Sequence, residues 1–393
     1  MFKPNPVAAA LLAAGAAGAA WLPFLRAAPN RMLSGEPVFL WDTLQGPSLA
    51  LALVLLLCLL CCAVQPAHLG KAGKAVTALL CLQTGTACVL VVLLLALAGQ
   101  HASHIALAQS AYARTSLGAG FWLLLLVFWL MAADALQRLQ ASLALRTAAL
   151  LLVALPIALL LASGKCNELS ILKEYANRAD VFAAAMLRHG LLVVLALVPT
   201  LLLGVPLGWW AYKNRATGRV LFPLLNVIQT IPSIALFGLL MAPLALLASA
   251  YPALARAGIS GVGIAPGVIA LVLYSLLPVV RGTLAGLEQV PSSVVNAARG
   301  MGMSASQIFR HAEFPLALPV LLAGVRTATV AAVGLASVTA LIGAGGLGSI
   351  MFEGLFSSAQ DLVLLGVVPI VGLAVLVDAA FKLLIAITQG HQP

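Results

Sequence analysis

Residues 294–319 read VVNAARGMGMSASQIFRHAEFPLALP, a polar and basic stretch between two long apolar runs. Arginine, histidine, glutamine, asparagine and serine gather here although they are rare in those runs. Ionisable groups are costly inside a bilayer, so a membrane chain keeps most of them outside the hydrocarbon. The stretch therefore predicts an exposed loop between two spans, where a soluble partner can dock.

The rest of the chain is apolar. Of 393 residues, 63% are hydrophobic and 8% are charged, and the mean hydropathy is +1.10. Soluble domains carry about 25% charged residues, and about 20 apolar residues cross a bilayer. We therefore expect an all-α, polytopic helical membrane protein. The net charge of +10 comes without a basic run, so nucleic-acid binding is not expected.

Apolar segments predict about ten transmembrane helices. The first is Ala-rich and follows Lys3, so a cleaved signal peptide is the alternative, although its run of about 19 residues exceeds a usual signal core. The segments are 7–25, 46–65, 75–98, 117–136, 147–163, 190–211, 220–248, 265–287, 318–342 and 362–388.

Basic residues in the short loops predict the orientation. With ten spans both termini lie on one side, and placing them in the cytoplasm puts three short basic loops there, as the positive-inside rule requires. The loop 294–319 is then cytoplasmic too, on the side where ATP is available. The basic residues of the three loops are Lys71, Lys74, Arg138, Arg146, Lys213, Arg215 and Arg219.

The chain divides near residue 164. Residues 1–164 hold five Ala/Leu-rich spans, 165–189 form a mostly extracytoplasmic linker, and 190–390 hold five spans richer in Gly, Pro, Gln, Thr and Ser. Helix-breaking residues at membrane depth are tolerated where the freed backbone faces a cavity or other protein. The transport pathway is therefore expected in 190–390. We find no internal repeat, which argues against an inverted-repeat secondary transporter.

Motifs of catalysis and metal binding are missing from the sequence. No GxxxxGK[ST] string provides an ATPase site, and no Ser/His/Asp or paired-carboxylate arrangement suggests an enzyme. Cys58 and Cys61 form a CxxC without a second ligand pair, so neither a metal nor another cofactor is expected.

Small residues and two helix signals organise the 294–319 loop. Ala297, Ala298, Gly300 and Gly302 are small and allow a partner close approach to the backbone. Ser304 is placed to cap a second helix at its N-terminus. Pro315 is expected to end or bend that helix before the next span. A helix, a tight turn and a second helix would form a short lever.

This spacing resembles the EAA loop of permease subunits in ATP-binding-cassette (ABC) importers, Glu-Ala-Ala, three residues, Gly, then nine residues before Ile-x-Leu-Pro. Ala297, Ala298, Gly302 and Pro315 fall on the pattern. Asn296 replaces its acidic residue, Ala312 its Ile and Phe314 its Leu, so one possible ion pair with the partner is lost. The resemblance implies a loop that seats in a cleft of the nucleotide-binding subunit.

Three further stretches resemble the glycine betaine/carnitine/choline, or osmoprotectant, branch of these permeases. They are Gly204–Gly208, Asn226–Ser233 and Ile342–Gly348. The resemblance covers about residues 185–390 and implies a binding-protein-dependent, MetI-like core. It does not extend to 1–164, and the closest match for such a long permease is the Yeh-type osmoprotectant system.

Polar side chains near breaks in two spans are the candidates for the pathway. Lining a water-filled path would avoid the cost of exposing them to lipid, while a helix kink without substrate contact is the alternative. Arg326 lies in the ninth span and is expected to pair with a carboxylate or face the vestibule. The candidates are Gln229, Thr230, Pro232, Ser233, Ser337 and Thr339.

Glycines 343, 345 and 348 match the dinucleotide string G-x-G-x-x-G. They follow a span rather than a strand, so a nucleotide site is rejected. With Gly346 they predict a flexible turn at the outer mouth, a possible gate. The glycines of this expected gate are Gly343, Gly345, Gly346 and Gly348.

The resemblance implies a permease of the bacterial cytoplasmic (inner) membrane. Its partners would be cytoplasmic ABC ATPase subunits, a periplasmic substrate-binding protein and a second permease subunit, identical or not. Glycine betaine is the implied substrate, and methionine or another small zwitterion is the alternative. An ion- or proton-coupled secondary transporter and a structural scaffold also remain open, and an ionisable relay would favour the former.

Overall fold

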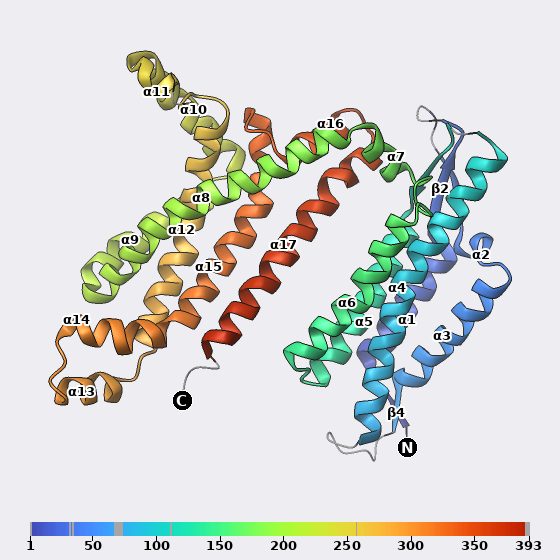
Figure 1. Cartoon of the computed structure of the whole chain (residues 1–393), viewed down its shortest axis with the longest axis horizontal. Helices are drawn as coiled ribbons and strands as arrows, with labels where there is room; N and C mark the ends of the chain where they lie inside the picture. The colour runs from blue at the N-terminus through green and yellow to red at the C-terminus, as the bar shows by residue number, and fades with distance from the viewer. Residues whose placement is uncertain are drawn as a thin grey trace. The chain divides into compact units, whose positions relative to one another are not determined.

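A computed structural model describes residues 2–30, 33, 35–66, 74–110, 112–256 and 258–389 (Figure 1). The chain forms two compact units, unit 1 up to Asn177 and unit 2 from Arg178. Both are mainly helical, which confirms the predicted all-α class. The boundary lies inside the predicted linker 165–189, whose residues are largely helical.

Unit 1 is a set of helices with short strands at their ends. In chain order its elements are β1 (Phe2–Pro4), α1 (Pro6–Trp21), β2 (Leu25–Ala28), β3 (Glu36–Val38), α2 (Leu40–Thr43), α3 (Pro47–Ala63), β4 (Val64–Pro66), α4 (Lys74–Ala108), β5 (Arg114–Leu117), α5 (Ala119–Arg138), α6 (Leu143–Ala162) and α7 (Ser170–Asn177).

Helix α4 is the centre of unit 1 and packs against α3, α5 and α6, while α1 packs against α5. Asn5 caps α1 by accepting a hydrogen bond from the Val7 N–H (3.1 Å). The Asn5 Oδ1 also accepts from Arg138 Nη2 at 2.6 Å, and its amide donates to Asp134. The cap thereby ties the start of α1 to the end of α5.

Short antiparallel strands close the ends of unit 1. Strand β2 pairs with β3 on one side and β5 on the other, with Leu25 opposite both Val38 and Leu117. Strand β1 pairs with β4. The sequence analysis did not predict these strands, because each has only three or four residues and too few alternations to produce a period-2 pattern.

Unit 2 comprises the elements from α8 to α17. In chain order its elements are α8 (Ala179–Lys213), α9 (Arg215–Thr230), α10 (Ser233–Ala250), α11 (Pro252–Arg256), α12 (Ile264–Glu288), α13 (Ser292–Gly300), α14 (Ala305–Ile308), the π-helical η1 (Phe309–Glu313), α15 (Phe314–Ala336), the 3₁₀ turn η2 (Val338–Ile342), α16 (Leu347–Phe356) and α17 (Gln360–Gln389).

Helix α12 lies between α8 and α15 and packs closely on both (Figure 1). A Cβ added at Gly208 would lie 2.6 Å from Thr283 Cβ, and one at Gly204 would lie 2.9 Å from Val279. On the other side, a Cβ at Gly282 would lie 2.8 Å from the Gly324 Cα. Small residues at such crossings let helix backbones approach within a membrane. The Gly204–Gly208 stretch is thus a packing surface.

The predicted spans correspond well to helices. Among the described residues, eight helical segments are long and apolar enough to cross a membrane, and α1 and α3 are shorter apolar helices that match the first two predicted segments. One predicted span needs correction: 220–248 is two helices, α9 and α10, because Pro232 lacks the N–H that a continuous helix requires. Lys71, used for the orientation, lies outside the described residues.

Candidate functional site

Helices α13 and α14 form the predicted helix–turn–helix of the 294–319 loop. Gly302 adopts φ +81°, its N–H donates to the Arg299 carbonyl (3.0 Å), and Met303 donates to the Ala298 carbonyl (3.2 Å). This is the double hydrogen bond of a Schellman C-cap, which places its glycine in the left-handed region. The tight turn therefore depends on the absence of a side chain at Gly302.

Ser304 begins the second helix as predicted. Its Oγ accepts from the Gln307 N–H (3.4 Å), and the Gln307 Oε1 accepts from the Ser304 N–H at 2.8 Å. The two residues form a reciprocal capping box, which satisfies two backbone donors at the start of a helix. The direction of α14 is fixed at its first residue.

Pro315 does not end this helix, contrary to one of the two predicted outcomes. Helix α14 continues through η1 into α15, and the Phe314 N–H donates five residues back to the Phe309 carbonyl. A proline ring clashes with the carbonyl four residues earlier in a regular α-helix. The wider π turn precedes Pro315, which then occupies the first turn of α15, where its missing N–H costs little.

Glu313 fastens this loop to the end of α8. Its side chain is buried, with one carboxylate oxygen 3.9 Å from the Lys213 Nζ and the other accepting from the Tyr212 hydroxyl at 3.5 Å. Nearby, the rings of Phe309 and Trp209 meet edge to face, 6.2 Å apart. Burial of a carboxylate is costly without partners, so this arrangement holds η1 against α8.

The exposed face of α13 is available to a partner. Asn296 and Ala297 are exposed, whereas Ala298 is buried beneath the turn. Gly302 and Pro315 are exposed as well. Four of the five predicted docking residues are therefore accessible on one loop, and Ala298 supports it from within.

The break between α9 and α10 brings several polar groups together. Gln229 Nε2 donates to the Tyr274 carbonyl at 2.6 Å, and the Tyr274 hydroxyl donates to the Ile231 carbonyl. Thr230 donates to the Val227 carbonyl (2.7 Å). Pro232 precedes α10 and Ser233 begins it. The break is thus braced by α12, and the sequence did not identify Tyr274 as the residue that braces it.

Ser337 and Thr339 lie where α15 gives way to the 3₁₀ turn η2. Their hydroxyls donate to the carbonyls of Gly334 (2.7 Å) and Ala336 (2.8 Å). Thr339 is fully buried and packs against Gly267 of α12. Both hydroxyls hydrogen-bond locally to backbone carbonyls where the helix tightens.

The glycine-rich turn after η2 rests on α8. Gly343, Gly345 and Gly346 all have φ near +80°, and a Cβ on Gly348 would collide with the Ser337 carbonyl at 1.9 Å. Only glycine adopts this sequence of conformations without strain.

Two consecutive residues of α8 hold that turn. Arg188 Nε donates to the Ala344 carbonyl at 3.1 Å. The fully buried His189 lies against Gly346, and its Nε2 is 3.0 Å from the Val333 carbonyl. The turn is therefore attached to α8, and His189 in addition attaches α8 to α15.

The loop and the glycine turn lie at opposite ends of one helix. Arg188 and Tyr212 are separated by 24 positions within α8, about 36 Å at 1.5 Å per residue. A bilayer's hydrocarbon is about 30 Å thick. A single helix thus connects two sites separated by a membrane's thickness.

Comparison with known proteins identifies the family. Residues 4–172 match the model of the "ABC transporter permease YehY, N-terminal domain", and residues 200–386 match that of the "binding-protein-dependent transport system inner membrane component". The osmoprotectant import permease protein OsmW of Salmonella typhimurium is 36% identical over 202 residues, which cover 51% of this chain and 89% of that protein. The chain belongs to the ABC importer permeases.

Other relatives agree with this assignment. The glycine betaine/carnitine/choline transport system permease protein OpuCD of Bacillus subtilis is 33% identical over 207 residues, 52% of this chain and 82% of that protein. Among solved structures, an inward-facing MetNI methionine ABC transporter chain aligns at 19% identity with a TM-score of 0.47, covering 54% of this chain and 98% of that one. The family assignment rests on the sequence matches.

Membership of the ABC importer permeases confirms the predicted class, including the long Yeh-type chain. The permease is a multi-pass protein of the inner membrane. This family assignment replaces the two alternatives, an ion- or proton-coupled secondary transporter and a structural scaffold.

The charged residue within the ninth span of the permease has a carboxylate partner, as one prediction proposed. Arg326 Nε lies 3.6 Å from Asp378 of α17, and Lys382 Nζ lies 2.6 Å from the other oxygen of that carboxylate. A charge at membrane depth is costly unless paired. Arg326 therefore joins α15 to α17.

Proposed function

We propose that this permease imports a small osmoprotectant such as glycine betaine, received from a separate periplasmic binding protein and driven by a cytoplasmic ATPase subunit. The relatives OsmW and OpuCD carry osmoprotectant and betaine in their names. The chain has no Walker string of its own, so ATP hydrolysis is assigned to the partner. Methionine or another small zwitterion is the alternative substrate.

The observation that carries the mechanism is the attachment of both candidate sites to α8. Glu313 fixes the 294–319 loop at one end of this helix, and Arg188 and His189 fix the glycine turn near the other. ATP-driven closure of the motor would displace the loop, and α8 would carry that displacement to the turn. Packed helices transmit motion because they switch between discrete arrangements rather than deform continuously.

Roles for the site residues follow from this scheme. Asn296, Ala297, Gly302 and Pro315 form the docking surface, and the buried Ala298 supports it from within. Asn296 binds through an amide where the EAA pattern has an acidic residue. The break at Gln229–Ser233, together with Ser337, borders the pathway, and the fully buried Thr339 supports this border from within. The turn from Gly343 to Gly348 is the outer gate.

The assembly is proposed to contain two permease chains, two ATPase subunits and one binding protein. Both termini of the chain and the 294–319 loop lie in the cytoplasm, as the basic short loops indicate. The glycine turn, about 36 Å away along α8, then faces the periplasm.

Two glycines of the docking loop provide a matched test. Gly302→Ala forces a side chain into φ +81°, which costs about 1–2 kcal/mol and disturbs the turn. Gly300→Ala places the same methyl group in helix α13, where a Cβ meets nothing within 4 Å. We expect Gly302→Ala to lower ATP-dependent uptake of labelled glycine betaine about tenfold and Gly300→Ala to leave it unchanged.

The uptake assay uses cells that express the permease with its ATPase and binding protein and lack other betaine importers. Copurification of the ATPase is measured in parallel. Equal uptake and equal copurification in the two variants would refute the role of the loop. If the ATPase copurifies normally and the cells import methionine instead of betaine, the coupling proposal stands. Only the proposed substrate would then be wrong.

A further inference from the structure

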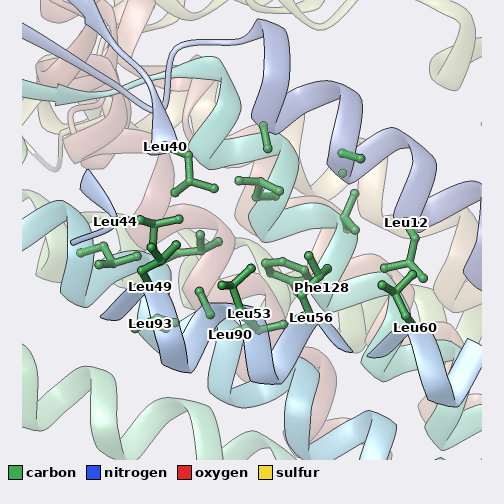
Figure 2. A pocket seen from close by; sticks show the side chains of 18 residues that line it. Leu12, Leu40, Leu44, Leu49, Leu53, Leu56, Leu60, Leu90, Leu93 and Phe128 are labelled. Carbon is green, nitrogen blue, oxygen red and sulfur yellow. The ribbon is translucent and has the colours of Figure 1, made fainter. Parts of the chain in front are cut away.

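Unit 1 contains an elongated apolar pocket of about 300 Å³ between α1, α3, α4 and α5, with α2 at one end (Figure 2). Leu49, Leu53, Leu56 and Leu60 form one wall along α3, and Leu90 and Phe128 belong to the opposite wall. Every lining residue is apolar or glycine. None of the residues proposed for transport lines it.

One wall of this pocket is accessible and the other is buried. The four leucines on α3 are 41–57% exposed, whereas Leu90 and Phe128 are 5% and 8% exposed. Residues 47–61 of α3 form an apolar helix, and α4 is a candidate span. The accessible side of the pocket is therefore expected to meet lipid hydrocarbon rather than water.

The dimensions suit one hydrocarbon chain. Leu49 and Leu60 are 11 positions apart on α3, about 16 Å at 1.5 Å per residue. Half of a hydrocarbon core about 30 Å thick is about 15 Å. The pocket is thus about as long as one leaflet is deep, and it follows a helix that crosses the leaflet.

The lining chemistry selects the occupant. Apolar cavities do not hold water, because a buried water needs two to four polar partners. A zwitterionic substrate would lose its hydration without gaining hydrogen bonds. An empty pocket would forfeit dispersion contacts along both walls. An alkyl chain recovers those contacts and is supplied by the bilayer at high concentration.

We propose that this pocket binds one acyl chain of a membrane phospholipid. The headgroup remains at the membrane surface, and the chain lies between α3 and the wall that contains Leu90 and Phe128. Unit 1 thereby binds one acyl chain, and none of the residues proposed for transport takes part.

Photocrosslinking of the full chain in phospholipid vesicles tests this site. The probe is a phosphatidylethanolamine with a diazirine in the middle of one acyl chain, and the adducts are mapped by mass spectrometry. We expect adducts at Leu90 and Phe128, which ordinary annular lipid cannot reach, as well as at the exposed Leu57. The same lipid with its diazirine on the headgroup should not label Leu90 or Phe128.

Alanine-to-phenylalanine variants provide the control. Ala52→Phe and Ala19→Phe fill the pocket from α3 and α1, and each should reduce the Leu90 and Phe128 adducts about tenfold, equivalent to about 1.4 kcal/mol of binding. Ala50→Phe adds the same ring to an exposed position of α3 and should change nothing.

Two results would overturn the proposal. One is wild-type labelling confined to exposed residues such as Leu57, and this result needs no variant to fold. The other is the persistence of adducts at Leu90 and Phe128 in correctly folded Ala52→Phe protein.

Discussion

The packing around Cys166, a residue outside the spans, sets the reactivity of its thiol. It lies in the turn between α6 and α7, is fully buried, and its Sγ would be 2.9 Å from a Cβ at Gly99 of α4. Burial raises the pKa of the Cys166 thiol above its ordinary value. The thiolate is the form that reacts with alkylating agents. The native thiol is therefore protected in two ways: reagents cannot reach it, and less of it is ionised.

We expect iodoacetamide to alkylate Cys166 at least about tenfold more slowly in the native permease than in the unfolded chain at pH 8. The reagent reaches the buried thiol only when the site opens locally, and the raised pKa leaves less of the thiol as thiolate. The native rate should rise as the pH is raised towards 10, since a raised pKa moves thiolate formation to higher pH. Peptide mapping after timed quenching measures both rates. Equal rates in the native and unfolded chains would show that Cys166 is not buried.

Single residues of the docking loop differ in how far the sequence could predict them. Gly302 and Ser304 were predictable because a C-cap glycine and an N-cap serine act through their own backbone neighbours. Glu313 and Tyr274 were missed because their roles depend on partners about 100 and 43 positions away. The sequence offered one signal for Glu313: acidic residues are rare in this chain, which has only 11, so each of them is a candidate for a specific role.

At the scale of elements, the crossing of α12 and α15 depends on glycine. A Cβ at Gly324 would lie 2.6 Å from the Pro278 carbonyl oxygen and 2.9 Å from the Gly282 Cα. Gly334, ten positions later on the same helix, has nothing within 4 Å of its Cβ position. Gly324→Ala must therefore separate the helices, a strain of about 1–3 kcal/mol.

Gly334→Ala should be neutral or slightly stabilising, because alanine favours helix by up to about 1 kcal/mol over glycine. Thermal unfolding in detergent, followed by loss of the monodisperse peak in size exclusion, compares the two variants with the parent. We expect a lower midpoint for Gly324→Ala alone. A midpoint lowered equally by both substitutions would instead indicate a general need for glycine in α15.

The lengths of the apolar segments predicted where the spans lie, but not where the helices end or break. Apolar length alone predicts where a helix can cross, so ten segments were found, but hydropathy continues through Pro232 although the helix does not. Conversely, Pro315 predicted either a helix end or a bend. The helix does not end there, because in η1 the Phe314 N–H bonds to the carbonyl five residues earlier. Both results depend on local backbone geometry, which an apolar pattern does not encode.

At the scale of the molecule, the transport scheme requires that the docking loop and the glycine turn face opposite compartments. Ala305 at the start of α14 and Ser358 after α16 are both exposed and mark the two ends of unit 2. In a cysteine-free permease, we expect Ala305→Cys to react with a membrane-impermeant maleimide only in inside-out vesicles. Ser358→Cys should react only in right-side-out cells, because charged reagents do not cross the hydrocarbon. Permeabilised membranes, in which both cysteines must react, control for access, and labelling of both from one side would rule out the proposed coupling through α8.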